Sequence, residues 1–132
     1  MRFVDTNVFI YVLVKSPRTV YETSKVILKR IENGEEALVT LAVLQEVVDW
    51  LEYNRRKNEV ETFVKVVNSY IALQKLPNTW NDFLEAPKDV EEYSIDFVDA
   101  LTVRAMRGMG VDEIYSTDTD FDRVKGLRRV FE

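Results

Sequence analysis

Apolar residues recur along this chain with two spacings, which alternate and predict its elements. Positions such as Val20, Ile27 and Ile31 recur every three to four residues, as expected for amphipathic helices. Short apolar, β-prone runs lie between such segments. The pattern predicts helices over 8–13, 19–32, 41 to the basic run at 55–57, 60–73, 90–94 and 96–107, strands over 2–5, 37–40, 113–117 and 128–131, a helical turn within the loop 118–125, and mixed strand and loop over 76–87.

Short strands that alternate with helices indicate the α/β class, because each parallel strand pair needs a helical crossover. We expect a three-layer α/β/α sandwich around a mainly parallel sheet of about five strands. The chain has no internal repeat, linker or low-complexity stretch. Residues 1–132 are therefore expected to form one domain.

Composition narrows the chemistry available to the chain. Hydrophobic residues make up 46% and charged residues 31%, which is typical of a folded globular protein. No apolar run is long enough for a membrane span, and the charge of Arg2 arrives too early for a secretory signal. We therefore expect a cytoplasmic protein with no membrane association.

The chain contains no cysteine and no histidine. This excludes disulfides, thiol nucleophiles and imidazole acid–base pairs, and it argues against zinc sites. Catalysis would have to use carboxylates, Lys, Tyr, Ser/Thr or a bound hard metal ion. The net charge of −5 argues against a pure nucleic-acid-binding module but is compatible with a nuclease that binds cations through acids.

Acidic residues fall at places where an α/β sheet binds ligands. Asp5 ends the first predicted strand and Asp118 follows a later one, and ligands bind outside the carboxyl ends of parallel strands. Asp5 could also cap the next helix, which is compatible with metal binding. Glu46 interrupts an apolar stretch, although it could instead lie on a solvated stripe with Asp49 and Tyr53.

A second group of acids lies in the last third of the chain. Asp96 and Asp99 are three residues apart at a helix start, hence on one face, where acids also serve as caps. Asp118 is followed by Asp120 and Asp122, which could simply be solvated loop residues. The functional interpretation requires the two groups to converge.

Four acidic blocks together resemble the PIN-domain family, particularly the VapC-type toxin ribonucleases of prokaryotic toxin–antitoxin pairs. The blocks are 4–8, 44–47, 96–101 and 116–122, and they occur in the family's order and spacing over essentially the whole chain. The resemblance implies that the catalytic and metal-binding acids are Asp5, Glu46, Asp99 and Asp118.

The resemblance also implies supporting residues. Asp120 would assist the four acids, and Asn7 and Ser116 would orient them through hydrogen bonds. Asp96 is interpreted as a helix cap in preference to a further metal ligand. Candidates for contacts with RNA phosphates lie close in sequence to the acids, although each taken singly is better explained as solvated surface charge: Arg104, Arg107, Arg123 and Lys125.

Crowded carboxylates repel one another and require cations, and an all-oxygen ligand set favours Mg²⁺ or Mn²⁺. The predicted function is that of a metal-dependent endoribonuclease, the toxin of a toxin–antitoxin pair. The alternatives are a housekeeping RNA-processing nuclease, a nuclease for structured DNA, for which the chain is short, and an inactive PIN-like binding or scaffold module.

By resemblance, the partners would be RNA, a second copy of the chain in a homodimer, and a small antitoxin whose C-terminal segment occupies the acidic groove. The broad apolar stripe over 60–73 is compatible with a dimer surface and equally with core burial.

Overall fold

The computed structural model describes residues 1–132 and contains one five-stranded sheet with the strand order β3-β2-β1-β4-β5. Every neighbouring pair of strands is parallel. The strand order reverses at the centre, because the chain adds β2 and β3 on one side of β1 and then β4 and β5 on the other. The strands are β1 (Arg2–Val4), β2 (Ala37–Thr40), β3 (Leu73–Leu76), β4 (Glu113–Tyr115) and β5 (Arg128–Val130).

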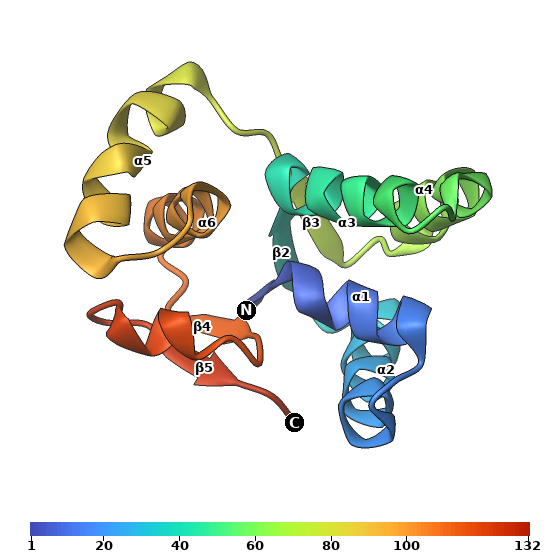
Figure 1. Cartoon of the computed structure of the whole chain (residues 1–132). Helices are drawn as coiled ribbons and strands as arrows, with labels where there is room; N and C mark the ends of the chain where they lie inside the picture. The colour runs from blue at the N-terminus through green and yellow to red at the C-terminus, as the bar shows by residue number, and fades with distance from the viewer.

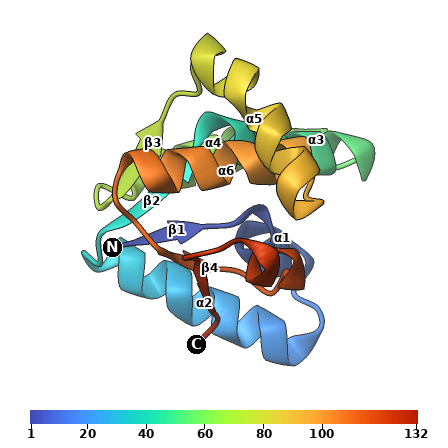
Figure 2. The same cartoon turned by 90° about the vertical axis from the view of Figure 1, so that its left-hand side faces the viewer.

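Six α-helices flank this sheet, so the predicted α/β class and parallel sheet are confirmed (Figure 1). Figure 2 shows α2 and α6 on opposite sides of β1 and β4. No helix combines the length and the apolar character that a membrane crossing requires. The helices are α1 (Thr6–Val14), α2 (Arg18–Glu32), α3 (Leu41–Tyr53), α4 (Val60–Ser69), α5 (Trp80–Tyr93) and α6 (Phe97–Gly108), with short 3₁₀ turns η1 (Lys57–Glu59) and η2 (Thr119–Arg123).

The central strands are covered on both faces. Every residue of β2 is buried, and Phe3 and Val4 of β1 are fully buried. This is why their sequences are continuous apolar runs without alternation. Asp5 therefore directly follows a fully buried segment of the central strand.

The predicted helix over 60–73 is too long. The helix ends at Ser69, and Tyr70 leaves helical geometry with φ −82° and ψ 84°. Leu73 instead begins β3 and pairs with Ala37 of β2. The position of Leu73 fits the helical spacing of the preceding apolar residues, but a single apolar residue is equally compatible with the two-residue period of a strand.

The prediction of mixed strand and loop over 76–87 and a short helix over 90–94 is also wrong. One helix, α5, runs through Pro87, which removes a single helical hydrogen bond. A capping box starts it: the Asp82 N–H donates to Thr79 Oγ1 at 3.1 Å, and the Thr79 N–H donates to Asp82 Oδ2 at 2.9 Å. Packing against α6, with Ala86 buried, offsets the cost of the proline.

Candidate metal centre

The two central strands bring the first pair of acids together. The Asp5 N–H, directly after β1, donates to the Tyr115 carbonyl at the end of β4, at 3.1 Å. Ser116 and Asp118 follow Tyr115 in the same chain segment. Because β1 and β4 are parallel neighbours, Asp5 and Asp118 emerge at the same edge of the sheet.

Asp5 is buried, with 5% of it exposed, and two hydrogen bonds fix the orientation of its carboxylate. Its Oδ1 accepts from the Thr6 N–H at 2.8 Å, and its Oδ2 accepts from the Ser116 hydroxyl at 2.7 Å. The Asp118 N–H donates to that same Ser116 oxygen at 2.9 Å. Ser116 therefore links the two acids, and its own side chain is fully buried.

Glu46 approaches from α3, which begins at the end of β2. The Thr6 hydroxyl donates to Glu46 Oε1 at 2.6 Å. Glu46 is half-buried, whereas Asp49 and Tyr53 on the same helix are exposed. Glu46 is thus turned toward Asp5, away from a solvated stripe.

The N-terminus of α6 supplies two more acids. Asp96 occupies the N-cap position with extended backbone, but its side chain makes no capping hydrogen bond. The capping interpretation therefore holds for its backbone position only. The carboxylates of both Asp96 and Asp99 face the cavity that Asp5 and Glu46 line.

These side chains form a cavity of about 300 Å³, in which acids make up five of the nine lining residues and none is basic. Carboxylate oxygens of Asp99, Asp118 and Asp120 lie within 4.8 Å of one another. Asp120 also accepts from Arg123 Nη1 at 3.0 Å. The nine residues that line the cavity are Asp5, Thr6, Asn7, Ile10, Glu46, Trp50, Asp96, Asp99 and Asp118.

Burial and mutual repulsion oppose ionisation of these acids. Desolvation raises the pKa of Asp5 to about 6, although hydrogen bonds from Ser116 and Thr6 act in the other direction. Desolvation followed by the charges of Asp5, Asp118 and Glu46 raises the pKa of Asp99 to about 8. The pKa of Glu46 is raised as well, mainly by desolvation. Without a cation, the centre holds protons near neutral pH.

The donor set fits a hard divalent cation. All candidate ligands are carboxylate oxygens, and three of them already lie close enough to share one ion. A cation there would relieve the repulsion that raises the carboxylate pKa values. The geometry thus allows Asp99, Asp118 and Asp120 to hold a metal, with Asp5, Glu46 and Asp96 on the surrounding wall.

Three of the four basic candidates for phosphate contacts bind the chain's own groups. Arg107 donates to Tyr93 Oη at 3.0 Å and lies 3.6 Å from Asp89, and Arg123 binds Asp120 together with two backbone carbonyls. Arg104 faces Asp82 at 3.8 Å. Lys125 is exposed.

Sequence reasoning missed three residues of the site. Thr6 positions Glu46, and its place directly after Asp5 was the available signal. Ile10 and Trp50 line the cavity from α1 and α3, one turn or more beyond the acids. Helical spacing from Glu46 to Trp50, four residues on, could have identified the second. Asn7, which the sequence does predict as a supporting residue, lines the cavity as well.

Comparison with known proteins gives a consistent family. The model of the PIN domain matches residues 2–127. A comparison with curated protein sequences finds no match. Among solved structures, Mycobacterium tuberculosis VapC20, described as a sarcin-ricin loop cleaving toxin, superposes with a TM-score of 0.82 at 18% identity over 100% of both chains.

Two further solved structures are similar in fold. A chain of a toxin–antitoxin complex from Klebsiella pneumoniae has a TM-score of 0.67 at 16% identity, covering 97% of this chain and 96% of that one. A chain of VapBC2 from Rickettsia felis, bound to a promoter DNA fragment, has a TM-score of 0.72 at 15% identity, covering 98% and 96%. At these identities the likeness concerns the fold alone.

Proposed function

Because this chain belongs to the PIN domain family, we propose that it is a metal-dependent endoribonuclease and the toxin of a toxin–antitoxin pair. One observation carries the proposal. Acids from four separate elements converge on a single cavity that contains no basic residue. A folded protein concentrates unneutralised charge in this way at functional sites, where a cation or substrate compensates it.

Asp5, Glu46, Asp99 and Asp118 are the proposed catalytic and metal-binding residues, with Asp120 and Asp96 in support. When bound, Mg²⁺ or Mn²⁺ would supply Lewis acidity for the RNA phosphate and activate a water molecule.

The chain itself contributes orientation and proton transfer. Ser116 and Thr6 fix the Asp5 and Glu46 carboxylates through their hydroxyl groups. With no histidine in the chain, the proton of the attacking water must pass to a carboxylate or to solvent. The pKa of Asp99 is raised to about 8, against about 6 for Asp5, and we assign Asp99 that role.

The proposal is tested by incubating the protein with a mixed pool of labelled RNA in Mg²⁺, in Mn²⁺ and in EDTA. We expect cleavage with either metal, none in EDTA, and a loss of at least about 100-fold in Asp5→Asn, because the negative charge of one proposed ligand is removed and asparagine has one acceptor oxygen for the two donors Thr6 N–H and Ser116 O–H. Asp122→Asn is the matched control, since Asp122 is exposed and bound to Arg129. Cleavage that persists in both EDTA and Asp5→Asn would refute the proposal.

The scaffold alternative makes a different prediction. A degenerate module has no need of a metal, whereas the proposed nuclease should bind Mn²⁺ in calorimetry. Absence of heat at millimolar Mn²⁺, with the protein folded, favours the scaffold. A housekeeping nuclease would bind metal and cleave RNA but would lack an inhibitory partner.

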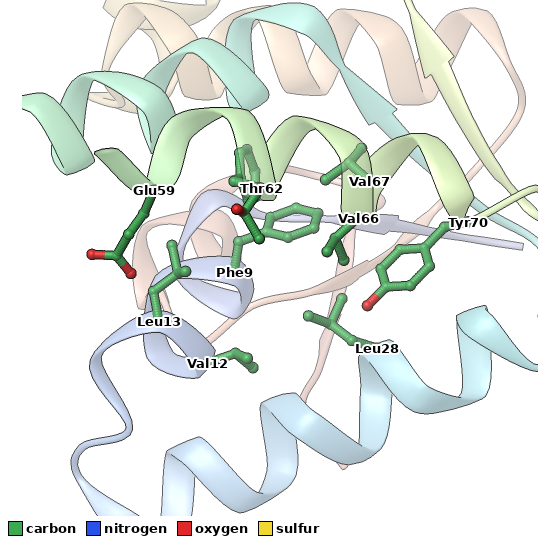
Figure 3. A pocket seen from close by; sticks show the side chains of 10 residues that line it. Phe9, Val12, Leu13, Leu28, Glu59, Thr62, Val66, Val67 and Tyr70 are labelled. Carbon is green, nitrogen blue, oxygen red and sulfur yellow. The ribbon is translucent and has the colours of Figure 1, made fainter. Parts of the chain in front are cut away.

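An antitoxin partner is part of the proposal, because two of the similar structures come from toxin–antitoxin complexes. We expect its C-terminal segment to place a basic side chain in the acidic cavity, by charge complementarity. A second feature suits such a partner: an apolar cavity of about 270 Å³ between α1, α2 and α4 (Figure 3). Phe9, Leu28 and Val66 line it and would accept apolar side chains of the same segment.

We also propose a homodimer. Of the apolar stripe on α4, Phe63 and Val67 are buried and Val66 lines the apolar cavity assigned to the antitoxin, so Val64 is the exposed valine left for a second copy of the chain. Sedimentation at high micromolar concentration tests this, and a monomer there would contradict it.

A further inference from the structure

The adjacent ends of α1 and α3 carry a group of basic residues: Lys15, Arg55, Arg56 and Lys57, here called the basic turn. The two helices pack against each other, and Figure 1 shows them leaving the sheet in the same direction. Asp5 at the start of α1 lines the acidic cavity, and so do Glu46 and Trp50 within α3. The basic turn therefore lies at the far end of the helix pair that carries these two acids.

Arg56 fixes the turn against the cavity wall. Its Nη2 donates to the Leu13 carbonyl of α1 at 3.1 Å, and its guanidinium forms an ion pair with Glu59. Its charged carbon lies 5.4 Å from the centroid of the Trp50 ring, and Trp50 lines the acidic cavity. One side chain thus connects the ends of both helices with a residue of the site.

The other three basic side chains of the turn do not make contacts of this kind. Lys15, Arg55 and Lys57 are exposed and make no ion pair. Residues 52–59 together with Lys15 contain four basic side chains and two acidic ones, Glu52 and Glu59, which leaves a net charge of +2 in a chain whose net charge is −5. Lys15, Arg55 and Lys57 therefore form a local concentration of unpaired positive charge.

Two of these residues occupy positions that favour glycine. Arg55 has φ 58° and Lys15 has φ 60°, both in the left-handed region. Arg55 sits in a Schellman motif, in which the Arg56 N–H donates to the Leu51 carbonyl at 2.8 Å and the Arg55 N–H to the Glu52 carbonyl at 3.2 Å. A residue with a Cβ atom is unfavourable in the left-handed conformation, so the basic residues at these two positions need an explanation.

The ordinary reason would be the helix dipole, which favours cations at a helix C-terminus. That reason accounts for stability but does not require the basic side chains of two helices to gather at one end of the helix pair that carries Asp5 and Glu46. It also predicts that removing them destabilises the fold and does nothing else. A role in binding would change a property other than stability, so an experiment can separate such a role from the helix-dipole effect.

We propose that the basic turn binds the backbone phosphates of single-stranded RNA that extends out of the acidic cavity across Trp50. The proposal rests on the endoribonuclease function. Seven helical steps separate Glu46 from Tyr53, the last residue of α3, which is about 10 Å along the axis, and Arg55 follows two residues later. A few nucleotides would span this separation. The turn thus supplies the positive charge that Arg107 and Arg123, bound to the chain's own groups, do not offer.

The test combines Lys15→Gly, Arg55→Gly and Lys57→Gln in one variant. Affinity is measured by anisotropy with a fluorescein-labelled single-stranded oligoribonucleotide in EDTA, so that no cleavage occurs. We expect binding about tenfold weaker at low salt and a plot of log affinity against log salt that is shallower by about 2, because three phosphate contacts are lost. Thermal stability should be unchanged or higher, because glycine suits both left-handed positions.

A control variant with the same charge change, Lys25→Gln with Lys29→Gln and Lys88→Gln, should retain wild-type affinity and salt slope. Equal RNA affinity in the two triple variants overturns the proposal, and a lower melting temperature with unchanged affinity assigns the turn to the helix dipole. Unchanged RNA affinity with weaker binding of an acidic protein partner assigns the turn to that partner and also overturns the proposal. Failure of the nuclease function is recognised separately, because it abolishes cleavage while binding in EDTA still depends on the turn.

Discussion

The strands of the sheet begin at one edge, here called the amino edge, and end at the other, the carboxyl edge. The two edges use the same ionisable residue types in opposite ways. At the amino edge, Glu113 at the start of β4 receives ion pairs from Arg2 and Arg128, which start the strands on either side. At the carboxyl edge, Asp5 and Asp118 follow β1 and β4 with further acids around them and no arginine in the cavity.

The consequences for the pKa values are opposite. Glu113 is desolvated, but Arg128 and Arg2 outweigh that effect and lower its pKa. Asp99 is desolvated and has only other acids to face, so its pKa rises. The amino edge is organised for stability, whereas the carboxyl edge tolerates a destabilising arrangement, as expected where strain and charge serve function.

The strongest test of this contrast is the pH dependence of stability without metal. Asp5 and Asp99 bind protons more tightly in the folded state than in the unfolded state. Their protonation therefore stabilises the fold below about pH 4, and that stability is lost as pH rises through about 6 and 8. We expect the free energy of unfolding, measured by urea denaturation, to fall by about 2–3 kcal/mol from pH 5 to pH 8.

The absence of histidine leaves this pH window free of other side chains that normally titrate there. Millimolar Mg²⁺ should restore most of the lost stability, because it binds the folded state only. Stability that stays constant or rises from pH 5 to pH 8 in EDTA would show that the acids are not destabilising.

A substitution at the carboxyl edge should stabilise the metal-free protein. Asp99→Asn removes the acid whose pKa is raised to about 8, so the cavity holds one fewer negative charge at high pH. We expect a gain of about 1–2 kcal/mol at pH 8 in EDTA, discounted for the partial exposure of Asp99, and a flatter pH profile. Asp122→Asn is the control and should leave the profile unchanged. Chemical denaturation at pH 5 and pH 8 distinguishes the outcomes.

A substitution in the hydrogen-bond network that Arg2 of the amino edge forms with the Tyr115 side chain should have the opposite sign and the smallest effect. The buried Tyr115 hydroxyl accepts from Arg2 at 2.9 Å and Arg30 at 3.1 Å and donates to Glu35 at 2.7 Å. Tyr115→Phe should cost about 1 kcal/mol, because charged partners lose a hydrogen bond while water can replace part of it. The loss should be the same at pH 5 and pH 8, and a pH-dependent loss would link this network to the acidic cavity.

Most of the fold was predictable because its signals are local. The apolar runs of β1 and β2 and the periodic helices α2, α3 and α6 lie close to their predicted bounds. The errors occur where local signals conflict. Leu73 satisfies a helical and a strand pattern, and Pro87 reads as a breaker inside a helix that tertiary packing holds together.

The sequence by itself determined which chemistry is available: no histidine, no cysteine, and acids at the ends of two strands and on two helices. Only the tertiary structure decided how those acids are used. The adjacency of β1 and β4 brings Asp5 and Ser116 into contact, 111 residues apart in sequence. Likewise, sequence proximity to the acids favoured Arg107 and Arg123, whereas folding pairs both with local partners. Hydrogen bonds and ion pairs act over a few ångströms in space, and such distances are set by packing, not by position in the chain.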